Sequence, residues 1–374
     1  MVRVIDAMSI RIKGLKKKFG SFVAVHGVDI EVPEGKMLVL LGPSGCGKTT
    51  TMRCIAGLEA PTEGIIELGG QPVFDSQRRI NVPVNHRNVG MVFQSYAIWP
   101  HMTVTENVAF PLKMQKLPTA EVEERVAEIL RIVGLEQFRD RGATSLSGGQ
   151  MQRVALARSL VMRPAVLLFD EPLSNLDARL RDHLRVELRE LQTRFNITSV
   201  FVTHDQSEAL SLADQIAVMN TGRVLQADDP VTIYQNPHSS VVADFIGYRN
   251  IFPGAVRQGG DDGILFALDE SSFELTSVHP PPPGEGGIFA CVRPEDFEIE
   301  AHRPDQPVKP NTFIGEVTSA SFMGSYTQYR VRSTTGQVID VFHNRAPLDL
   351  PPGSPARLHV APKSVLLLPM RSAS

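Results

Sequence analysis

A glycine-rich segment near the start of the chain carries residue types that bind phosphate. It matches the pattern GxxxxGK[ST] and lies between an apolar run, Met37–Leu41, and a helical pattern over residues 48–58. Glycines let backbone N–H groups converge on phosphate oxygens, while a lysine and a hydroxyl reach the β- and γ-phosphates and Mg²⁺. A flexible turn would need neither side chain. The predicted phosphate-binding residues are Gly42, Pro43, Ser44, Gly45, Cys46, Gly47, Lys48, Thr49 and Thr50.

Within this segment two residues have further predicted roles. Lys48 is expected to take part in catalysis at the γ-phosphate, and Thr49 is expected to bind Mg²⁺ through its hydroxyl.

Two adjacent carboxylates follow a second apolar run. Residues 166–169 are Val-Leu-Leu-Phe, the pattern of a buried strand, and Asp170 and Glu171 come directly after them. Asp170 would then lie at the carboxyl edge of the strand, where it can hold Mg²⁺ through a water, and Glu171 can polarise the attacking water. Without a phosphate-binding loop, a solvated turn would be the simpler interpretation. Together with the loop, the pair predicts hydrolysis of a nucleoside triphosphate.

The segment Leu-Ser-Gly-Gly-Gln at residues 146–150 allows two interpretations. Ser147 and Gln150 fit the S-x-x-Q capping box that starts an ordinary helix. The segment also fits a second anion site, because Gly148 and Gly149 would let a ligand approach the N–H groups of a helix N-terminus. The residues alone do not decide between them.

With this segment the chain resembles the ATPases of ABC transporters. LSGGQ is the signature sequence of that family, and here it lies some twenty residues before Asp170, as in the family. The resemblance implies ATP and Mg²⁺ as cofactors and nucleotide contacts for Ser147, Gly148, Gly149 and Gln150. One departure is Met151, where an arginine is common, which puts a helix-surface contact in doubt but removes no phosphate ligand.

The resemblance also assigns roles to four positions outside these motifs. Phe19 would stack on the adenine, Gln94 would reach Mg²⁺ and the attacking water, and His204 would be the switch histidine at the γ-phosphate. Residues 174–177, ending in Asp177, would form the D-loop and contact nucleotide. Three of these residues have a plainer interpretation: Phe19 as core, Gln94 as a surface amide and His204 as a strand-end histidine satisfied locally.

A single phosphate loop and a single signature segment imply that two chains act together. ABC ATPases clasp each nucleotide between the loop of one subunit and the signature of another, so two ATP molecules would join two chains, as a homodimer or a pseudo-symmetric pair. The family also places its permease contacts beside the glutamine loop, which here is followed by Ser95, Tyr96, Ala97, Ile98 and Trp99. As an alternative, Tyr96 and Trp99 simply pack a helical subdomain.

The elements that must position these residues indicate an α/β fold. Amphipathic helical patterns at residues 119–133, with Thr119 as N-cap, and at 184–195 alternate with apolar strand patterns such as Thr198–Thr203. This predicts a mostly parallel sheet of the P-loop NTPase type over residues 1–240, with a helical subdomain at about 95–162. Residues 241–374 show short β runs such as Ile288–Val292, which predicts a small all-β, OB-like (TOBE-type) regulatory domain.

Composition narrows the class of protein. The 374 residues include 38 basic and 41 acidic side chains for a net charge of −3, which argues against nucleic acid as the main partner. Three cysteines form no CxxC pair, and no apolar run approaches the roughly 18 residues that span a bilayer. Residues 1–9 lack the apolar stretch of a secretory signal, so the cytoplasm is expected.

Two further segments extend the resemblance to importer ATPases of the maltose, polyamine and ferric-iron type. Residues 291–296, Cys-Val-Arg-Pro-Glu-Asp, are like the VRPED stretch of their tails, and residues 243–247 are like the segment that closes their ATPase domain. Apart from this setting, Arg-Pro-Glu-Asp would be a surface turn.

This resemblance implies an ATPase that drives solute uptake. It would bind integral-membrane permease subunits at the cytoplasmic face of the membrane, fed indirectly by an extracytoplasmic binding protein. The solute could be a polyamine, ferric ion, a sugar or an organophosphorus compound. The alternative is a soluble, non-transport ABC ATPase that acts as an ATP-dependent dimer switch.

Overall fold

The computed structural model describes residues 8–260, 263–269, 273–281, 287–304, 307 and 309–370. Residues 1–7, which belong to the stretch considered above for a secretory signal, lie outside the described part. The chain divides into two compact units, Met1–Ile233 and Tyr234–Ser374.

A six-stranded sheet forms the centre of the first unit. Its strand order is β11-β10-β3-β9-β8-β7, and neighbours are parallel except for the antiparallel pair β10–β11. Every residue of β3, β8 and β9 is buried, as expected for parallel strands covered on both faces. The predicted, mostly parallel sheet is confirmed. The strands are β3 (Met37–Leu41), β7 (Val89–Val92), β8 (Val166–Asp170), β9 (Thr198–Thr203), β10 (Gln215–Asn220) and β11 (Arg223–Asp228).

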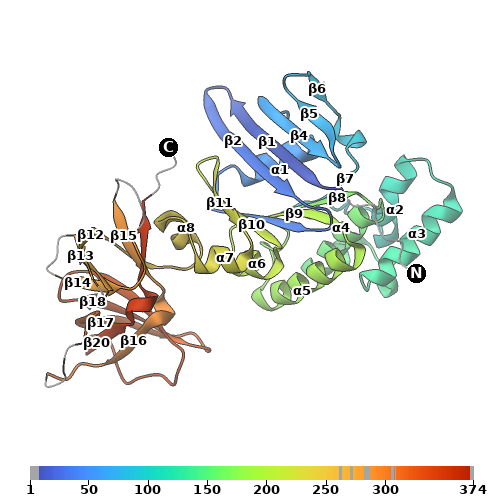
Figure 1. Ribbon diagram of the computed structural model, residues 1–374. Coiled ribbons are helices and arrows are strands. Elements are labelled where there is room, and N and C mark those ends of the chain that lie inside the picture. Colours follow the sequence, from blue (N-terminus) through green and yellow to red (C-terminus); the bar gives the residue numbers. More distant parts are fainter. Residues whose placement is uncertain are drawn as a thin grey trace. The chain divides into compact units, whose positions relative to one another are not determined.

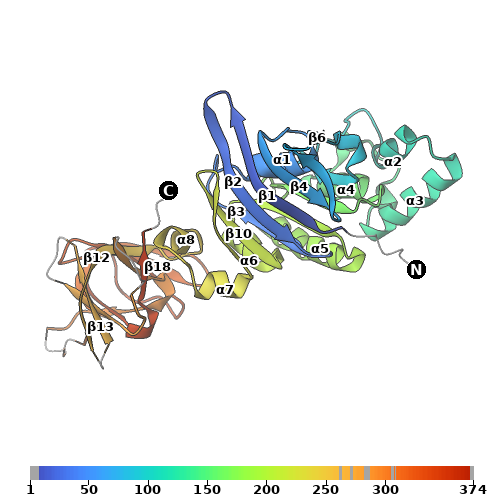
Figure 2. The same cartoon turned by 45° about the horizontal axis from the view of Figure 1, so that its top comes forward.

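A second, antiparallel sheet was not predicted. Its order is β2-β1-β4-β5-β6, and β1 and β2 form a long hairpin that is drawn in blue in Figure 2. Register shifts in β1, at Ile12/Leu15 and Leu15/Lys16, interrupt the alternation that would have identified it from the sequence. The strands are β1 (Ile10–Phe19), β2 (Phe22–Val32), β4 (Glu63–Leu68), β5 (Gln71–Asp75) and β6 (Ile80–Asn81).

Helix α1 (Lys48–Ala56) packs in the core that the two sheets share. Its Met52, Cys54 and Ile55 belong to one apolar cluster with residues from β1, β2, β3, β8 and β9. The helix ends two residues before the predicted limit because Gly57 adopts a left-handed conformation with φ 82°. Arg87, 2% exposed, donates to the carbonyl oxygens of Cys54 and Ile55 at 2.8 and 2.9 Å and so satisfies the end of α1.

The remaining helices of this unit are α2 (Val104–Met114), α3 (Thr119–Ile132), α4 (Gly148–Leu160), α5 (Ala178–Phe195) and α6 (Gln206–Leu212). Figure 1 shows α2 and α3 as a lobe on the side of α4. The predicted N-cap of α3 is wrong: Pro118 holds that position without a side-chain cap, and Thr119 is the first helical residue. Proline preorganises the extended cap conformation, so the helix starts without help from the threonine hydroxyl.

Two five-stranded antiparallel sheets make up the second unit, with orders β14-β13-β12-β15-β21 and β16-β20-β17-β18-β19. Both sheets contribute to one apolar core, which includes Phe266, Phe313 and Tyr329. The predicted small β domain of OB-like type is confirmed. The strands are β12 (Asn250–Gly260), β13 (Gly263–Leu268), β14 (Glu274–Ser277), β15 (Ile288–Val292), β16 (Phe297–Ala301), β17 (Thr312–Phe322), β18 (Thr327–Ser333), β19 (Val338–His343), β20 (Pro355–Val360) and β21 (Leu366–Pro369).

Two short helices, α7 (Pro230–Gln235) and α8 (Ser240–Phe245), precede these strands along the chain. Arg293, in the VRPED-like segment, is 6% exposed, lies 3.4 Å from the ring centroid of Tyr234 and 4.2 Å from that of Tyr248, and donates to the carbonyl oxygen of Ile246. Residues Pro294–Asp296 do form a short turn. The arginine is nevertheless buried, so this segment is more than a surface turn.

In the described part of the chain, no helix combines the length and the apolar character needed to cross a membrane.

Candidate functional site

The glycine-rich loop between β3 and α1 is shaped by close backbone contacts. A Cβ atom on Gly42 would lie 2.1 Å from the carbonyl oxygen of Met219, and one on Gly47 would lie 2.6 Å from that of Ala24. Both glycines also have positive φ angles, 156° and 101°. Glycine is therefore required at both positions. Lys48 is 4% exposed, and its Nζ donates to the carbonyl oxygens of Gly42 and Pro43 at 2.8 and 2.9 Å, so the ammonium group is held under the loop.

The structure brings two of the predicted metal-binding residues together. Thr49, in the first turn of α1, donates its hydroxyl to Asp170 Oδ1 at 3.1 Å, and Asp170 ends β8. Burial raises the pKa of Asp170. The hydrogen bond from Thr49 and the positive charge of Arg53, whose Nη2 lies 3.8 Å from Asp170 Oδ2, lower it, but the effect of burial is larger. A cation beside this carboxylate would therefore stabilise its charged form.

Thr49 and Asp170 suit Mg²⁺ better than a metal ion whose ligands all come from protein side chains. Among the described residues, no group of three or more His, Cys, Asp or Glu side chains could hold a metal ion. Mg²⁺ typically takes one or two carboxylates and completes its shell with substrate phosphates and water. One buried carboxylate and one hydroxyl next to a phosphate-binding loop fit that preference.

Glu171 and His204 also lie together, at the carboxyl ends of the neighbouring strands β8 and β9. His204 Nδ1 is 3.4 Å from Glu171 Oε2, and the Glu171 amide donates to the carbonyl oxygen of Val202 at 3.2 Å. Glu171 has a φ angle of 44°, an uncommon conformation for a residue with a side chain. The glutamate and the histidine thus lie side by side at the carboxyl end of the parallel strands.

Gln94 contacts the D-loop segment, residues 174–177. Its Nε2 donates to Ser174 Oγ at 3.1 Å, and its backbone oxygen accepts from Asn175 Nδ2 at 3.0 Å. The Ser174 hydroxyl in turn donates to the carbonyl oxygen of Glu171 at 3.0 Å. Gln94 is therefore tied to the backbone beside Glu171, and no hydrogen bond between described residues links it to Thr49 or Asp170.

Ser147 and Gln150 form the capping box that the sequence allowed. Ser147 Oγ accepts from the Gln150 amide at 3.4 Å, and Gln150 Oε1 accepts from the Ser147 amide at 2.9 Å. A Cβ on Gly148 would lie 3.3 Å from Leu176 Cδ2, and one on Gly149 would lie 2.9 Å from Leu180 Cδ1. Within the chain, the signature segment is thus packed against the D-loop and the start of α5.

Phe19 and Asp177 occupy exposed positions at the ends of their elements. Phe19 is 45% exposed at the β1–β2 turn, and Lys17 Nζ lies 4.5 Å from its ring centroid. Phe19 is therefore not a core residue. Asp177 is the N-cap of α5, with Oδ1 accepting from the Leu180 amide at 3.0 Å.

Arg158 on α4 was not predicted, although it organises the segment after Gln94. Its guanidinium donates to the carbonyl oxygens of Tyr96 and Ala97 at 2.9 and 2.6 Å and lies 4.7 Å from the ring centroid of Trp99. Trp99 also packs against Phe110 of α2, with ring centroids 4.3 Å apart. These contacts join segments about sixty positions apart, so no local spacing could have revealed them.

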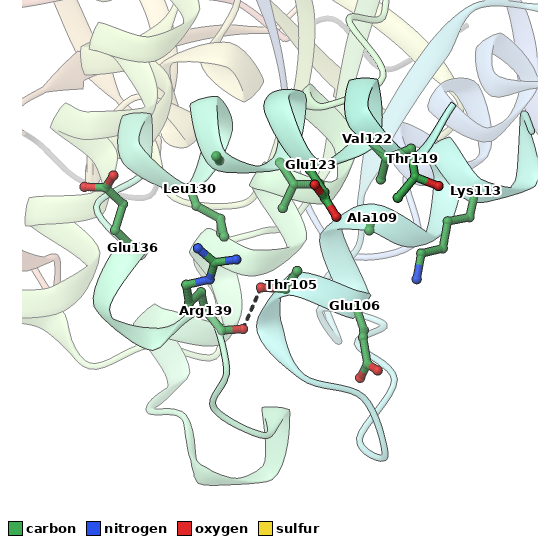
Figure 3. A pocket seen from close by; sticks show the side chains of 12 residues that line it. Thr105, Glu106, Ala109, Lys113, Thr119, Val122, Glu123, Leu130, Glu136 and Arg139 are labelled. Atoms are coloured by element: carbon green, nitrogen blue, oxygen red, sulfur yellow. Dashed lines mark hydrogen bonds between the residues drawn. The ribbon is translucent and has the colours of Figure 1, made fainter. Parts of the chain in front are cut away.

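A separate apolar groove lies between α2 and α3. Figure 3 shows Thr105 and Ala109 on the α2 side and Val122 and Leu130 on the α3 side, with the Thr105 hydroxyl donating to the carbonyl oxygen of Arg139 at 2.7 Å. The groove encloses about 260 Å³ and contains none of the predicted nucleotide-binding residues.

Comparison with known proteins matches both parts of the chain. Residues 25–174 match the ABC transporter family model, and residues 290–368 match the TOBE domain model. The chain is 46% identical over 323 residues to the spermidine/putrescine import ATP-binding protein of Thermobifida fusca, covering 86% of this chain and 82% of that one. It is 40% identical over 363 residues to the Fe(3+) ions import ATP-binding protein of Pectobacterium atrosepticum, covering 96% of each.

The chain belongs to the ATP-binding subunits of ABC importers. The resemblance drawn from the signature segment and from the VRPED-like stretch is thereby confirmed, and so is an ATPase coupled to solute import.

Solved structures of ABC ATPases share the fold of this importer ATPase. The cbiO1 protein from Clostridium perfringens, part of an ABC transporter complex, is 28% identical, with a TM-score of 0.56 over 66% of this chain and 96% of its own. The dimeric ATP-binding cassette MJ0796, bound to ADP and phosphate, is 30% identical, with a TM-score of 0.51 over 59% of this chain and 98% of its own. The importer ATPase thus has the fold of ATP-binding cassettes.

Proposed function

We propose that two copies of this importer ATPase close around two ATP molecules to drive solute uptake. The observation that carries the proposal is that, within one chain, the phosphate-binding loop and the signature segment lie in separate places. The loop at 42–49, Asp170, Glu171 and His204 gather at one sheet edge, whereas the signature segment packs against Leu176 and Leu180 and has no side-chain hydrogen bond to the loop among the described residues. A nucleotide held by one chain would then need the signature of the other.

In the proposed site, the chain's own residues bind the phosphates and activate water. The backbone N–H groups of residues 42–50, apart from Pro43, which has none, and the Lys48 ammonium bind the β- and γ-phosphates. Phe19 stacks on the adenine. Glu171 accepts the proton of the attacking water, and His204 contacts the γ-phosphate. Gln94 positions that water, while Ser147, Gly148, Gly149 and Gln150 of the other chain, with Asp177, complete the pocket.

Mg²⁺ would be held at Thr49 and Asp170, with Gln94 as a third contact. When bound, it neutralises charge on the phosphates. The hydrogen bond between Thr49 and Asp170 and the burial of that carboxylate support this assignment.

We further propose that residues 1–240 are the ATPase domain, with the helical subdomain at about 95–162, and that residues 241–374 are a regulatory domain. The permease would hold the subunit at the cytoplasmic face of the membrane, and an extracytoplasmic binding protein would deliver the solute. The two import proteins compared above carry spermidine/putrescine and Fe(3+) in their names, which favours a cationic solute. Uptake of labelled spermidine, ferric ion and maltose by cells with and without the subunit would test this choice. Uptake of maltose alone would contradict it.

Permease contact is proposed at residues 95–99. Tyr96 and Trp99 also serve the fold, since the Tyr96 hydroxyl would lie 3.8 Å from a Cβ on Gly148 and Trp99 packs on Phe110. Tyr96→Asp should uncouple transport, yet it would also disturb the signature segment. Ala97 is exposed, and its φ of 49° suits Asp and Asn at least as well as alanine.

Ala97→Asp therefore offers the cleaner test. The added charge should abolish solute uptake while the isolated subunit keeps its ATP hydrolysis, and Ala97→Asn serves as the neutral control. Normal uptake with Ala97→Asp, measured beside an unchanged amount of co-purified permease, would exclude residues 95–99 as the contact.

A further inference from the structure

One arginine of α5 connects the backbone of the D-loop with the first turn of α6. Arg181 Nη2 donates to the carbonyl oxygen of Leu176 at 3.1 Å. Its Nη1 lies 3.6 Å from Asp205 Oδ2, and its Nε lies 4.0 Å from Glu208 Oε1. The guanidinium therefore bridges the segment that follows Glu171 and the segment that follows His204.

The α6 side of this bridge is fixed tightly. Glu208 is 4% exposed and accepts from the Thr203 hydroxyl at 2.6 Å, and that hydroxyl accepts from the Asp205 amide at 2.9 Å. Asp205 also caps α6 by accepting from the Ser207 and Glu208 amides at 2.7 and 3.2 Å. His204 lies between Thr203 and Asp205, so its backbone position is set by this network.

The other side of the bridge contacts the signature segment. Leu176 is buried, and its Cδ2 would lie 3.3 Å from a Cβ on Gly148. Movement of the signature segment or the D-loop would therefore shift the carbonyl oxygen to which Arg181 donates.

The Nε atom of Arg181 could gain a hydrogen bond if such a shift moved the guanidinium toward Glu208. It is buried without a hydrogen-bond partner among the described residues, and the carboxylate that it faces is 4.0 Å away. A hydrogen bond of this kind is about 2.9 Å long, so an approach of roughly 1 Å would complete it. A buried, unsatisfied N–H on a charged group favours the arrangement that pairs it.

We propose that Arg181 is a positioning residue that sets His204 and the start of α6 according to the position of the D-loop. The inference rests on the proposed roles of His204 and the D-loop. Among the described residues, the Arg181 side chain has no hydrogen bond or ion pair to a residue assigned to the phosphates. Its loss should therefore slow hydrolysis without weakening nucleotide binding.

The test compares Arg181→Met with Arg185→Met, another arginine of α5 whose ion pair, to Asp182 at 3.2 Å, stays within the helix. Steady-state ATP hydrolysis gives kcat and KM, and titration with ATP in the presence of EDTA gives the binding affinity. Arg181→Met should lower kcat at least tenfold and change ATP affinity less than twofold. Arg185→Met should match the parent in both, and Arg181→Lys should recover part of the turnover.

The double variant Arg181→Met/Glu208→Gln distinguishes a folding defect from a loss of positioning, because it also removes the buried negative charge that has lost its ion pair with Arg181. Its unfolding midpoint should return toward that of the parent while kcat stays low. Turnover within twofold of the parent in Arg181→Met, or turnover restored together with stability in the double variant, would overturn the inference. If the parent itself failed to hydrolyse ATP, the proposed function would fail instead.

Discussion

Replacing Glu171 by glutamine changes the chemistry of the site and little else. Glutamine has the same length, fits the same φ of 44° at no greater cost, and keeps the hydrogen bond from the backbone N–H of residue 171 to the carbonyl oxygen of Val202. What is lost is the negative charge that lies 3.4 Å from His204 Nδ1 and the ability to accept a proton from water. The variant should therefore fold and bind ATP as the parent does.

The size of the effect follows from the role proposed for this carboxylate. General-base catalysis contributes about 10²- to 10⁴-fold to a rate, or roughly 3 to 5 kcal/mol of barrier. Because Lys48 and His204 remain in place, we expect turnover to fall at least tenfold and nucleotide-bound dimer to accumulate.

Phosphate release from ATP and size-exclusion chromatography with ATP measure these two outcomes. Glu190→Gln, at an exposed glutamate of α5, is the matched control and should hydrolyse ATP at the parent rate. Turnover in Glu171→Gln equal to that of the parent would remove Glu171 from its assigned role.

Two other residues give independent predictions. Phe19→Ala should weaken ATP affinity by on the order of 1 kcal/mol, about fivefold, with kcat unchanged, because only stacking is lost; equal affinity in fluorescence titration would mean that another aromatic contacts the adenine. Burial alone would raise the pKa of Asp214, but hydrogen bonds from Arg189 and the Met37 amide, with the charges of Arg189 and Lys36, lower it to about 2. This folded-state pKa lies below the value of about 3.9 expected for aspartate in the unfolded chain. The charged Asp214 therefore stabilises the folded state fully above about pH 4, and this contribution is lost as the pH falls toward 2. Urea unfolding should therefore show Asp214→Asn less stable than the parent at pH 6, with a gap that closes between pH 4 and 2; a gap independent of pH would refute this.

The parts of the site that the sequence predicted are those fixed by local chain geometry. Strand β3, the glycine loop and α1 follow one another within twenty residues, and their order alone places Lys48 and Thr49 at the end of a parallel strand. Ser147 and Gln150 likewise form their capping box within four residues. In both cases the residues and their spacing determine the geometry.

Contacts between segments far apart in the chain could not be predicted from the sequence. Arg158 reaches the backbone of residues 96 and 97, and Arg87 reaches the end of α1 from more than thirty residues away. An arginine on a helix has no spacing that reveals which carbonyl oxygens it will meet. The antiparallel sheet was missed for a related reason, since bulges in β1 shift its alternation and its exposed face is rich in lysine.

The central claim is that each nucleotide is shared between two chains, and a structure of Glu171→Gln bound to ATP and Mg²⁺ tests it most directly. We predict a dimer in which the γ-phosphate contacts Lys48 of one chain and lies about 3 Å, hydrogen-bond distance, from the hydroxyl of Ser147 of the partner subunit. ATP enclosed by a single chain, with Ser147 of both chains far from any phosphate, would contradict the account.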